Sequence, residues 1–376
     1  MIPLKKRIDS HIHYAHPMNP EMLISFMDET DTHMANLVLV PHTKRLSALP
    51  DAMMAKASYP DRFYVFGSLD PSEYYRHPKT LGKHMAAHGR RMRRCGCDGL
   101  KIIEGKPNMR RILPIPDFDL PCWEPFWAWA EKDQMPIIWH VNDPKDYWST
   151  EGASEFRRKM GDMYGENDVG YEQQYEQVFR VLERHPRLKI VFSHFLFLSW
   201  DLPRLGEILD TYPSICIDVT PGSEMYRILS ANHAEAQAFF KKYYNRILYG
   251  TDAGARCVVT QLMSEFHQQE NRNRIELINS FFTPETDEIR GSDGAYLIDV
   301  PDFAFKGLDL TEEELDHIFC KNFQAFVGEV PAPVKPRAVI RECRRICTTL
   351  KIMGYIDKNL VADLSVAQNA IAFFKK

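Results

Sequence analysis

The stretch Arg7-Ile8-Asp9-Ser10-His11-Ile12-His13 places two histidines two residues apart in a short run that contains β-branched residues. If this run is a strand, its side chains alternate between two faces, so His11 and His13 point the same way and Ile12 points the other way. Two imidazoles on one face can bind one metal ion. Taken alone, the pair is equally compatible with polar residues on an exposed strand, because histidine is common in both roles.

Three later apolar runs each end in a residue that can bind a metal or transfer a proton. They are Pro136-Ile-Ile-Trp-His140, Lys189-Ile-Val-Phe-Ser-His194 and Arg246-Ile-Leu-Tyr-Gly-Thr-Asp252. An apolar strand has no structural need for such a residue at its carboxyl end, and burying it without a partner is costly. The repeated arrangement therefore indicates one shared site that collects these residues and the first two histidines.

The composition excludes several classes of protein. The chain has 376 residues, 44% of them hydrophobic, and a formal net charge of -4, so it can bury a large core without a strong electrostatic bias. It has no basic surface of the kind that binds nucleic acid. No apolar run approaches the roughly 20 residues of a membrane span, and no apolar signal segment precedes the first strand. We therefore expect a cytoplasmic protein that acts on a small molecule.

The cysteines are scattered along the chain, and without a secretion signal we expect them to be reduced thiols. Cys95 with Cys97, and Cys343 with Cys347, are the pairs that could bind a metal or form a redox pair. Neither is accompanied by a second Cys/His pair with the spacing of a zinc site, so free thiols are the favoured interpretation.

Short apolar runs alternate with amphipathic ones through most of the chain. The pattern predicts strands at residues 7–13, 35–40, 62–67, 99–103, 135–140, 188–194, 215–219 and 246–251. Apolar residues at helical spacing lie between them, at 19–31, 46–58, 78–94, 171–184, 201–211 and 233–244. This alternation matches the α/β class and its (β/α)8 TIM barrel. A doubly wound open sheet is the rival fold, but only a closed barrel brings all the strand ends around one opening.

Other segments depart from this alternation. Residues 142–170 exceed the usual length of a connection and are a candidate lid or specificity loop. Beyond Asp252 we predict a helix at 258–282, a helix from Thr311 to Val327 and a proline-rich linker at 330–336. We divide the chain into a TIM-barrel domain, residues 1–330, and a C-terminal helical extension, residues 331–376. The extension packs either on the barrel or on a second subunit, which leaves a homo-oligomer open.

The carboxyl ends of barrel strands face one cavity, where barrel enzymes carry their catalytic groups. We predict a single divalent metal ion, because imidazoles and a carboxylate suit a borderline ion such as zinc, with manganese as the alternative. Its predicted ligands are His11, His13, His140 and Asp252. Zinc lowers the pKa of bound water toward about 7. His194 then remains as the acid/base residue, and Asp252 can also accept a proton.

At this point the pattern resembles the amidohydrolase superfamily. The motifs D-S-H-I-H, I-I-W-H-V-N, V-F-S-H-F and L-Y-G-T-D-A are most similar to the amidohydrolase-related branch, which includes aminocarboxymuconate semialdehyde decarboxylase and several lactone hydrolases. The resemblance covers roughly residues 7 to 328 and implies the same metal ligands, with His194 as the acid/base. It is specific for the superfamily but weak for the reaction, because hydrolases, hydratases and non-oxidative decarboxylases in this branch have similar metal sites.

Two cations are candidate substrate-binding residues. Lys101, on the predicted fourth strand, is a carbamylated bridge between two metals, an ammonium that binds a substrate carboxylate, or an ordinary surface or salt-bridged lysine. The mononuclear relatives do not depend on a bridging lysine, so we expect one metal. Arg256 lies four residues after Asp252, and together with Lys101 it would make a cationic rim for an acidic substrate.

These residues predict a metal-dependent hydrolase, in which metal-activated water attacks an ester, lactone or amide carbonyl of a small acidic substrate. The alternative is a non-oxidative carboxy-lyase that decarboxylates a carboxylated aromatic or dienoic acid at the same ion. A third interpretation is a metal-stabilised scaffold without activity. It is disfavoured because a structural metal site needs neither an additional polar residue such as His194 nor an open coordination position.

Overall fold

A computed structural model describes residues 6–14, 19–42, 44–151, 158, 163–222, 224–254, 265–282, 307–356 and 362–376. Its parallel sheet has the strand order β10, β9, β8, β7, β6, β5, β2, β1, β11. β10 (Ile247–Leu248) and β11 (Ala253–Gly254) lie at opposite ends of this order, yet only residues 249–252 separate them in the chain. β10 pairs with β9 and β11 pairs with β1, so these two short strands are parts of one interrupted eighth strand that closes the sheet. This closure confirms the predicted (β/α)8 TIM barrel.

The remaining barrel strands follow the predicted order along the chain. They are β1 (Arg7–His13), β2 (Thr32–Val38), β5 (Phe63–Ser68), β6 (Gly99–Gly105), β7 (Ile137–Val141), β8 (Ile190–Phe192) and β9 (Ile215–Asp218). Two short strands, β3 (Pro41–His42) and β4 (Leu46–Ser47), form a separate antiparallel pair. Apolar residues of the barrel strands fill the barrel interior near their amino ends, and the polar residues lie near their carboxyl ends, as barrel enzymes require.

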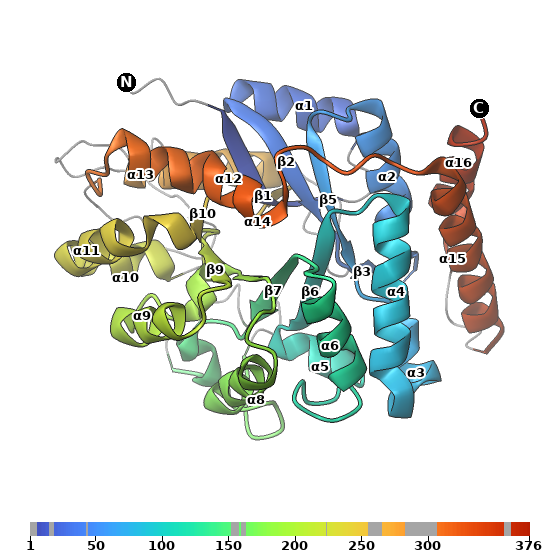
Figure 1. Ribbon diagram of the computed structural model, residues 1–376, viewed down its shortest axis with the longest axis horizontal. Coiled ribbons are helices and arrows are strands. Elements are labelled where there is room, and N and C mark those ends of the chain that lie inside the picture. Colours follow the sequence, from blue (N-terminus) through green and yellow to red (C-terminus); the bar gives the residue numbers. More distant parts are fainter. Residues whose placement is uncertain are drawn as a thin grey trace.

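Helices surround the sheet on its outer side (Figure 1). Those between the strands are α1 (Pro20–Glu29), α2 (Leu49–Ser58), α3 (Ser72–Arg76), α4 (Leu81–Cys95), α5 (Pro107–Ile112), α6 (Glu124–Lys132), α8 (Tyr171–Arg184), α9 (Leu202–Thr211), α10 (Met225–Ala231) and α11 (His233–Tyr243). After the barrel closes come α12 (Glu265–Phe281), α13 (Glu312–Asp316), a π-helical turn (His317–Lys321) and α14 (Asn322–Val327). Within the described residues no helix is both long and apolar enough to cross a bilayer.

An irregularity in β1 decides which way its histidines point. The register of β1 against β2 shifts between Asp9 and Ile12. Before the shift, Ile8 packs among the interior residues of the barrel, whereas after it Ile12 packs between sheet and helices. A bulge re-aims the side chains that follow it. Because side chains alternate beyond this point, His11 and His13 share the interior face, as the sequence predicted.

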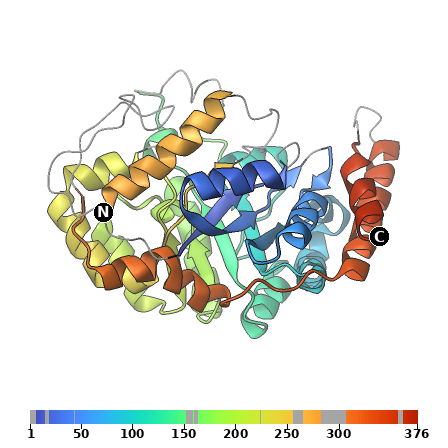
Figure 2. The same cartoon turned by 90° about the horizontal axis from the view of Figure 1, so that it is seen from above.

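The C-terminal extension packs on the barrel's own helices. It contains α15 (Pro336–Ile356) and α16 (Ser365–Phe373), which lie along the outer side of α4 and α2 (Figures 1 and 2). Arg345 pairs with the buried Asp70 at 2.8 Å, and Glu342 pairs with Arg91 at 3.1 Å. The extension thus packs on the barrel of its own chain, which was one of the two alternatives that the sequence left open. The division into two domains at residue 330 remains a prediction.

Several boundaries differ from the sequence-based expectations. The sixth strand ends at Phe192 rather than His194, and the eighth is interrupted between its two short parts. Of the predicted helix at 258–282, residues 258–264 lie outside the described residues, as does part of the 142–170 segment.

Candidate metal centre

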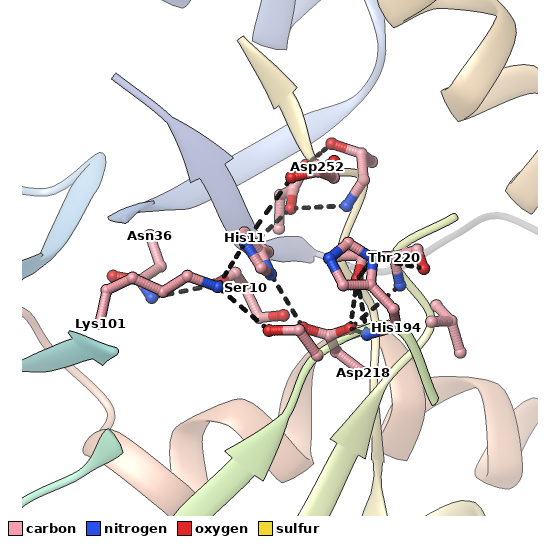
Figure 3. A network of polar contacts seen from close by, with 12 residues as sticks. Ser10, His11, Asn36, Lys101, His194, Asp218, Thr220 and Asp252 are labelled. Atoms are coloured by element: carbon pink, nitrogen blue, oxygen red, sulfur yellow. Dashed lines mark hydrogen bonds and ion pairs between the residues drawn. The ribbon is translucent and has the colours of Figure 1, made fainter. Parts of the chain in front are cut away.

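Three predicted ligands meet where β1 and the eighth strand end. Nε2 of His13 lies 3.0 Å from Oδ1 of Asp252, and Nε2 of His11 lies 3.7 Å from the same oxygen. One donor atom from each residue lies within 4.8 Å of the others. His11 is fully buried, and Asp252 approaches it from the neighbouring strand (Figure 3). These residues form a compact set of two imidazoles and one carboxylate.

Asp9 joins the two strand ends. Its Oδ1 accepts hydrogen bonds from the backbone N–H groups of His11 (3.0 Å) and Thr251 (3.1 Å), and its Oδ2 accepts one from the Thr251 hydroxyl (2.5 Å). The N–H of Asp252 in turn donates to the carbonyl of His11 at 2.9 Å. Asp252 has a φ of 54°, a left-handed conformation that non-glycine residues rarely adopt. The paired strand ends thus hold the Asp252 backbone in the conformation that presents its carboxylate to the histidines.

His140 and His194 lie beside this set. The ring centroid of His194 is 4.9 Å from that of His140 and 5.9 Å from that of His11. His140 is not in the compact group, and its Nε2 is 3.5 Å from Oδ1 of Asp143. The structure therefore gathers His11, His13 and Asp252 tightly, with His140 and His194 adjacent.

A left-handed turn presents His194. Residues 194–197 all have φ values between 53° and 57°, and none of them is glycine. The N–H of His194 donates to Oδ1 of Asp218 at 2.8 Å, which ties the turn to β9. Such backbone conformations are costly and persist only where surrounding contacts hold them. The strain is therefore consistent with a functional position for His194.

Asp218 is a site residue that the sequence-based prediction missed. Its Oδ2 lies 2.9 Å from Nδ1 of His11, and its Oδ1 accepts hydrogen bonds from the N–H of His194 and from the Thr220 hydroxyl (Figure 3). A carboxylate can only accept, so Nδ1 of His11 carries the proton and Nε2 keeps its lone pair. A signal was present in the sequence, because Asp218 ends an apolar strand just as the predicted ligands do.

Thr220 fixes the tautomer of His194 in the same way. The Thr220 hydroxyl donates to Asp218, and its oxygen lies 3.0 Å from Nδ1 of His194. The Thr220 carbonyl oxygen is 3.3 Å from the same nitrogen. Nδ1 of His194 therefore donates a proton to Thr220, which leaves the lone pair on Nε2. Burial, together with His140, lowers the pKa of His194 to about 3, so the ring is neutral at pH 7.

Lys101 lies inside the site and not on the surface. Its side chain is buried, and its Nζ lies 3.2 Å from Nε2 of His11 and 3.1 Å from the Ser193 hydroxyl. Burial lowers the pKa of Lys101 to about 8, although Asp218 and Asp252 oppose this shift. The other predicted cation, Arg256, lies outside the described residues.

Arg274, on α12, is a second residue that the sequence did not reveal. It donates from Nη1 to Oδ2 of Asp252 at 3.2 Å, on the oxygen that does not face the histidines. Nothing in the polar sequence of α12 distinguishes it from a solvent-exposed arginine. The Asp252 carboxylate is thus held from both sides.

These residues fit a divalent metal ion. His11 offers a neutral Nε2, since burial, followed by the charge of Lys101, lowers its pKa well below the usual value. Burial would raise the pKa of Asp252, but the hydrogen bond and charge of His13 and the other histidines outweigh it and hold the pKa far below its usual range. Nε2 of His140 is buried and makes no well-aligned hydrogen bond among the described residues, with Oδ1 of Asp143 3.5 Å away. Neutral imidazole and ionised carboxylate are the forms that bind zinc-like ions.

Comparisons with known proteins extend this description. A family model described as Amidohydrolase matches residues 8–328. No curated protein matches the sequence significantly. Among solved structures, 2,6-dihydroxybenzoate decarboxylase complexed with 2,6-dihydroxybenzoate is 15% identical with a TM-score of 0.51, and the alignment covers 86% of this chain and 99% of that chain.

Two further structures are similar. An uncharacterized TIM-barrel protein from Bordetella bronchiseptica is 14% identical with a TM-score of 0.52, over 86% of this chain and 99% of that chain. A dihydroxybenzoic acid decarboxylase from a Polaromonas species, with bound manganese and the inhibitor 2-nitroresorcinol, is 14% identical with a TM-score of 0.50, over 86% and 97%. At such identities these likenesses show the fold alone.

Proposed function

We propose that this chain, which belongs to the amidohydrolase family, is a metal-dependent hydrolase that cleaves an ester, lactone or amide bond of a small acidic substrate. The observation that supports this proposal most strongly is the convergence of His11, His13 and Asp252, whose donor atoms lie within 4.8 Å of one another at the carboxyl ends of barrel strands. Barrel enzymes carry out their chemistry at this end of the strands.

The proposed ligands are His11, His13, His140 and Asp252. His11 and His13 would bind through Nε2, the nitrogen that each turns toward Asp252. A divalent ion bound here, zinc or alternatively manganese, would supply a Lewis acid that polarises the substrate carbonyl and activates water. Asp218 holds the ring of His11 in the required tautomer, an arrangement common among metal-binding histidines.

His194 is the proposed general base. Its Nδ1 donates to Thr220, so Nε2 is the nitrogen that can accept a proton from the attacking water. Because the ring is neutral at pH 7, Nε2 carries the free lone pair that a general base requires. Asp252, which lies between His13 and Arg274, would then receive this proton and pass it to the leaving group.

Lys101 is the proposed binding group for an acidic substrate. It is a buried cation next to His11, with a serine hydroxyl as its other polar contact and no carboxylate within ion-pair distance among the described residues. An ammonium in such surroundings can bind a substrate carboxylate without first breaking an internal ion pair. We keep Arg256 as a second proposed contact, and a cytoplasmic location remains a prediction.

Decarboxylation is the second candidate reaction, and Lys101 is the observation that favours it. A buried ammonium beside the proposed metal ligands could hold a carboxylate that is lost as carbon dioxide. The similar structures of dihydroxybenzoate decarboxylases share the fold and extend this idea to carboxylated phenols. In that reaction a protonated residue delivers a proton to the carbon that loses the carboxylate.

Product analysis of the zinc- or manganese-loaded protein separates the two reactions. We expect lactones and esters that carry a carboxylate to be hydrolysed, with no carbon dioxide from carboxylated phenols. Carbon dioxide release without hydrolysis would contradict the proposal and support the carboxy-lyase.

The variant His194→Ala tests whether the centre is catalytic. Loss of the proposed base should reduce turnover about 100-fold or more. The variant should keep its metal, because His194 is not a proposed ligand. The exposed His33 provides the control variant His33→Ala, which should retain full activity. Unchanged turnover of every substrate in His194→Ala would favour a structural metal site instead.

A further inference from the structure

A second group of potential metal ligands lies outside the barrel interior. Glu73 is on α3, His77 follows the end of this helix, and His84 is in the first turns of α4. A donor atom from each of the three lies within 4.8 Å of the others. α3 and α4 follow β5, and α3 lies at one end of α4 in Figure 1. The group is therefore built from the connection between β5 and the helix layer.

The carboxylate of Glu73 has an unusual environment. Glu73 is 4% exposed, yet among the described residues no lysine or arginine lies within ion-pair distance of it. Its charged neighbours are Nδ1 of His77 at 2.6 Å and Nδ1 of His84 at 3.6 Å. Burying a carboxylate is costly unless a cation or several hydrogen-bond donors compensate it. Two imidazoles and a buried carboxylate together are a typical set of zinc ligands.

The distances are close to those that a shared ion requires. Zinc binds nitrogen and oxygen at about 2.0–2.1 Å in a tetrahedron, which places neighbouring ligand atoms roughly 3.3 Å apart. The distance between Oε2 of Glu73 and Nδ1 of His84, 3.6 Å, is close to this value. The distance between Oε2 of Glu73 and Nδ1 of His77, 2.6 Å, is that of a hydrogen bond and would lengthen on metal binding.

The two rings would also have to turn. Their planes are nearly parallel, at 7°, with centroids 3.5 Å apart. An ion lies in the plane of each imidazole that binds it, so a shared ion requires the rings to tilt away from each other. Their side chains are 31% and 37% exposed, which leaves room for this rotation.

We propose that Glu73, His77 and His84 form a second zinc site, which links α3 to α4. The carboxylate supplies charge compensation in a buried position, and each histidine supplies Nδ1. Water would occupy the remaining coordination position, because the described residues offer three donors here. None of its three residues is among the proposed ligands of the barrel centre.

Zinc stoichiometry tests this proposal. The full-length protein, dialysed against micromolar free Zn²⁺, is analysed by mass spectrometry for bound metal. His84→Ala should bind one ion fewer per chain than the wild type, whereas the control His33→Ala should bind the same number. The readout is the difference between variants, so it does not depend on whether the barrel centre is occupied. His13→Ala, which removes a proposed ligand of the barrel centre, measures zinc binding at that centre separately. Equal zinc contents of the wild type and His84→Ala would overturn the proposal.

A measurement on the wild type removes dependence on how the variant folds. Anomalous diffraction at the zinc edge, from crystals of the zinc-loaded protein, should show a peak bonded to Glu73, His77 and His84, with the two rings tilted apart. Zinc-loaded crystals in which the rings remain stacked, without a peak between them, would contradict the site.

Discussion

At the scale of single residues, Asp218 connects the proposed ligand His11 to the proposed base His194. Its two carboxylate oxygens contact the His11 ring and the His194 backbone separately. The same carboxylate therefore orients one ring for metal binding and holds the strained turn that presents the other. This double role explains why a charged residue is fully buried at the end of β9.

Asp218→Asn should weaken metal binding about 10- to 100-fold, the usual effect of losing a carboxylate that orients a metal-binding histidine. Competition with a chelator of known affinity measures the change. Asp210→Asn is the matched control, because Asp210 is an exposed residue that pairs with Lys242 at 3.0 Å. Equal metal affinities of Asp218→Asn and the wild type would show that Asp218 does not orient His11.

Glu104 provides a pH-dependent prediction away from the proposed ligands. Burial raises its pKa to about 7, against the opposing effects of backbone hydrogen bonds, Tyr74 and Lys101. The folded state therefore binds this proton more tightly than the unfolded state. The contribution of Glu104 to the free energy of unfolding is most favourable below the pKa that Glu104 has in the unfolded chain, and it is lost as the pH rises through 7. Glu104→Gln mimics the neutral acid. As the pH rises from 5 to 8, the wild type should therefore lose on the order of 3 kcal/mol of its free energy of unfolding relative to Glu104→Gln.

Urea unfolding of Glu104→Gln and the wild type at both pH values tests this directly. Other buried acids with raised pKa values, such as Asp9, are present in both proteins and cancel in the comparison. A stability difference that does not change with pH would mean that Glu104 is not protonated in the folded protein.

The sequence identified some site residues and not others for physical reasons. His11, His13, His140, His194 and Asp252 could be selected because each stands at or just beyond the carboxyl end of an apolar strand. Asp218 obeys the same rule and could have been found. Arg274 could not, because its role depends on how α12 folds back over the strand ends, and charged residues on a helix are usually solvent-exposed.

At the scale of elements, short apolar runs predicted the barrel strands, but not the left-handed backbone at the ends of two of them. β8 stops two residues before His194 because the chain enters a left-handed turn there. No glycine marks that turn, so its sequence reads as continuous strand. The interruption of the eighth strand has a similar cause, since Asp252 is also left-handed. In both cases the left-handed conformation, which the sequence did not predict, occurs at a residue of the proposed site.

The C-terminal helix α15 supports a stability prediction. Arg345 pairs with Asp70, which is 2% exposed and follows β5, and also contacts Glu342 at 2.7 Å. Arg345→Met should leave the Asp70 carboxylate buried without its cation and destabilise the protein by about 3 kcal/mol. Urea unfolding measures the loss. Arg344→Met, on the exposed face of the same helix, should change stability little. Equal effects of the two substitutions would show that α15 does not stabilise the barrel through this pair.

At the scale of the whole molecule, barrel closure brings the site together. β1 and the eighth strand are far apart in the sequence, yet His11 and Asp252 are neighbours because the strand parts β10 and β11 pair with opposite ends of the sheet. The sequence predicted this architecture because strands and helices alternate regularly. It could not predict where the extension packs, since Arg91 on α4 and Glu342 on α15 are more than 200 positions apart in the sequence.

Anomalous diffraction from zinc-loaded crystals tests the central claim at the barrel opening most directly. A peak bonded to Nε2 of His11, Nε2 of His13 and a carboxylate oxygen of Asp252, with His140 as a further ligand, is the predicted result. Crystals that bind zinc elsewhere, with these imidazoles and the carboxylate left uncoordinated, would contradict it.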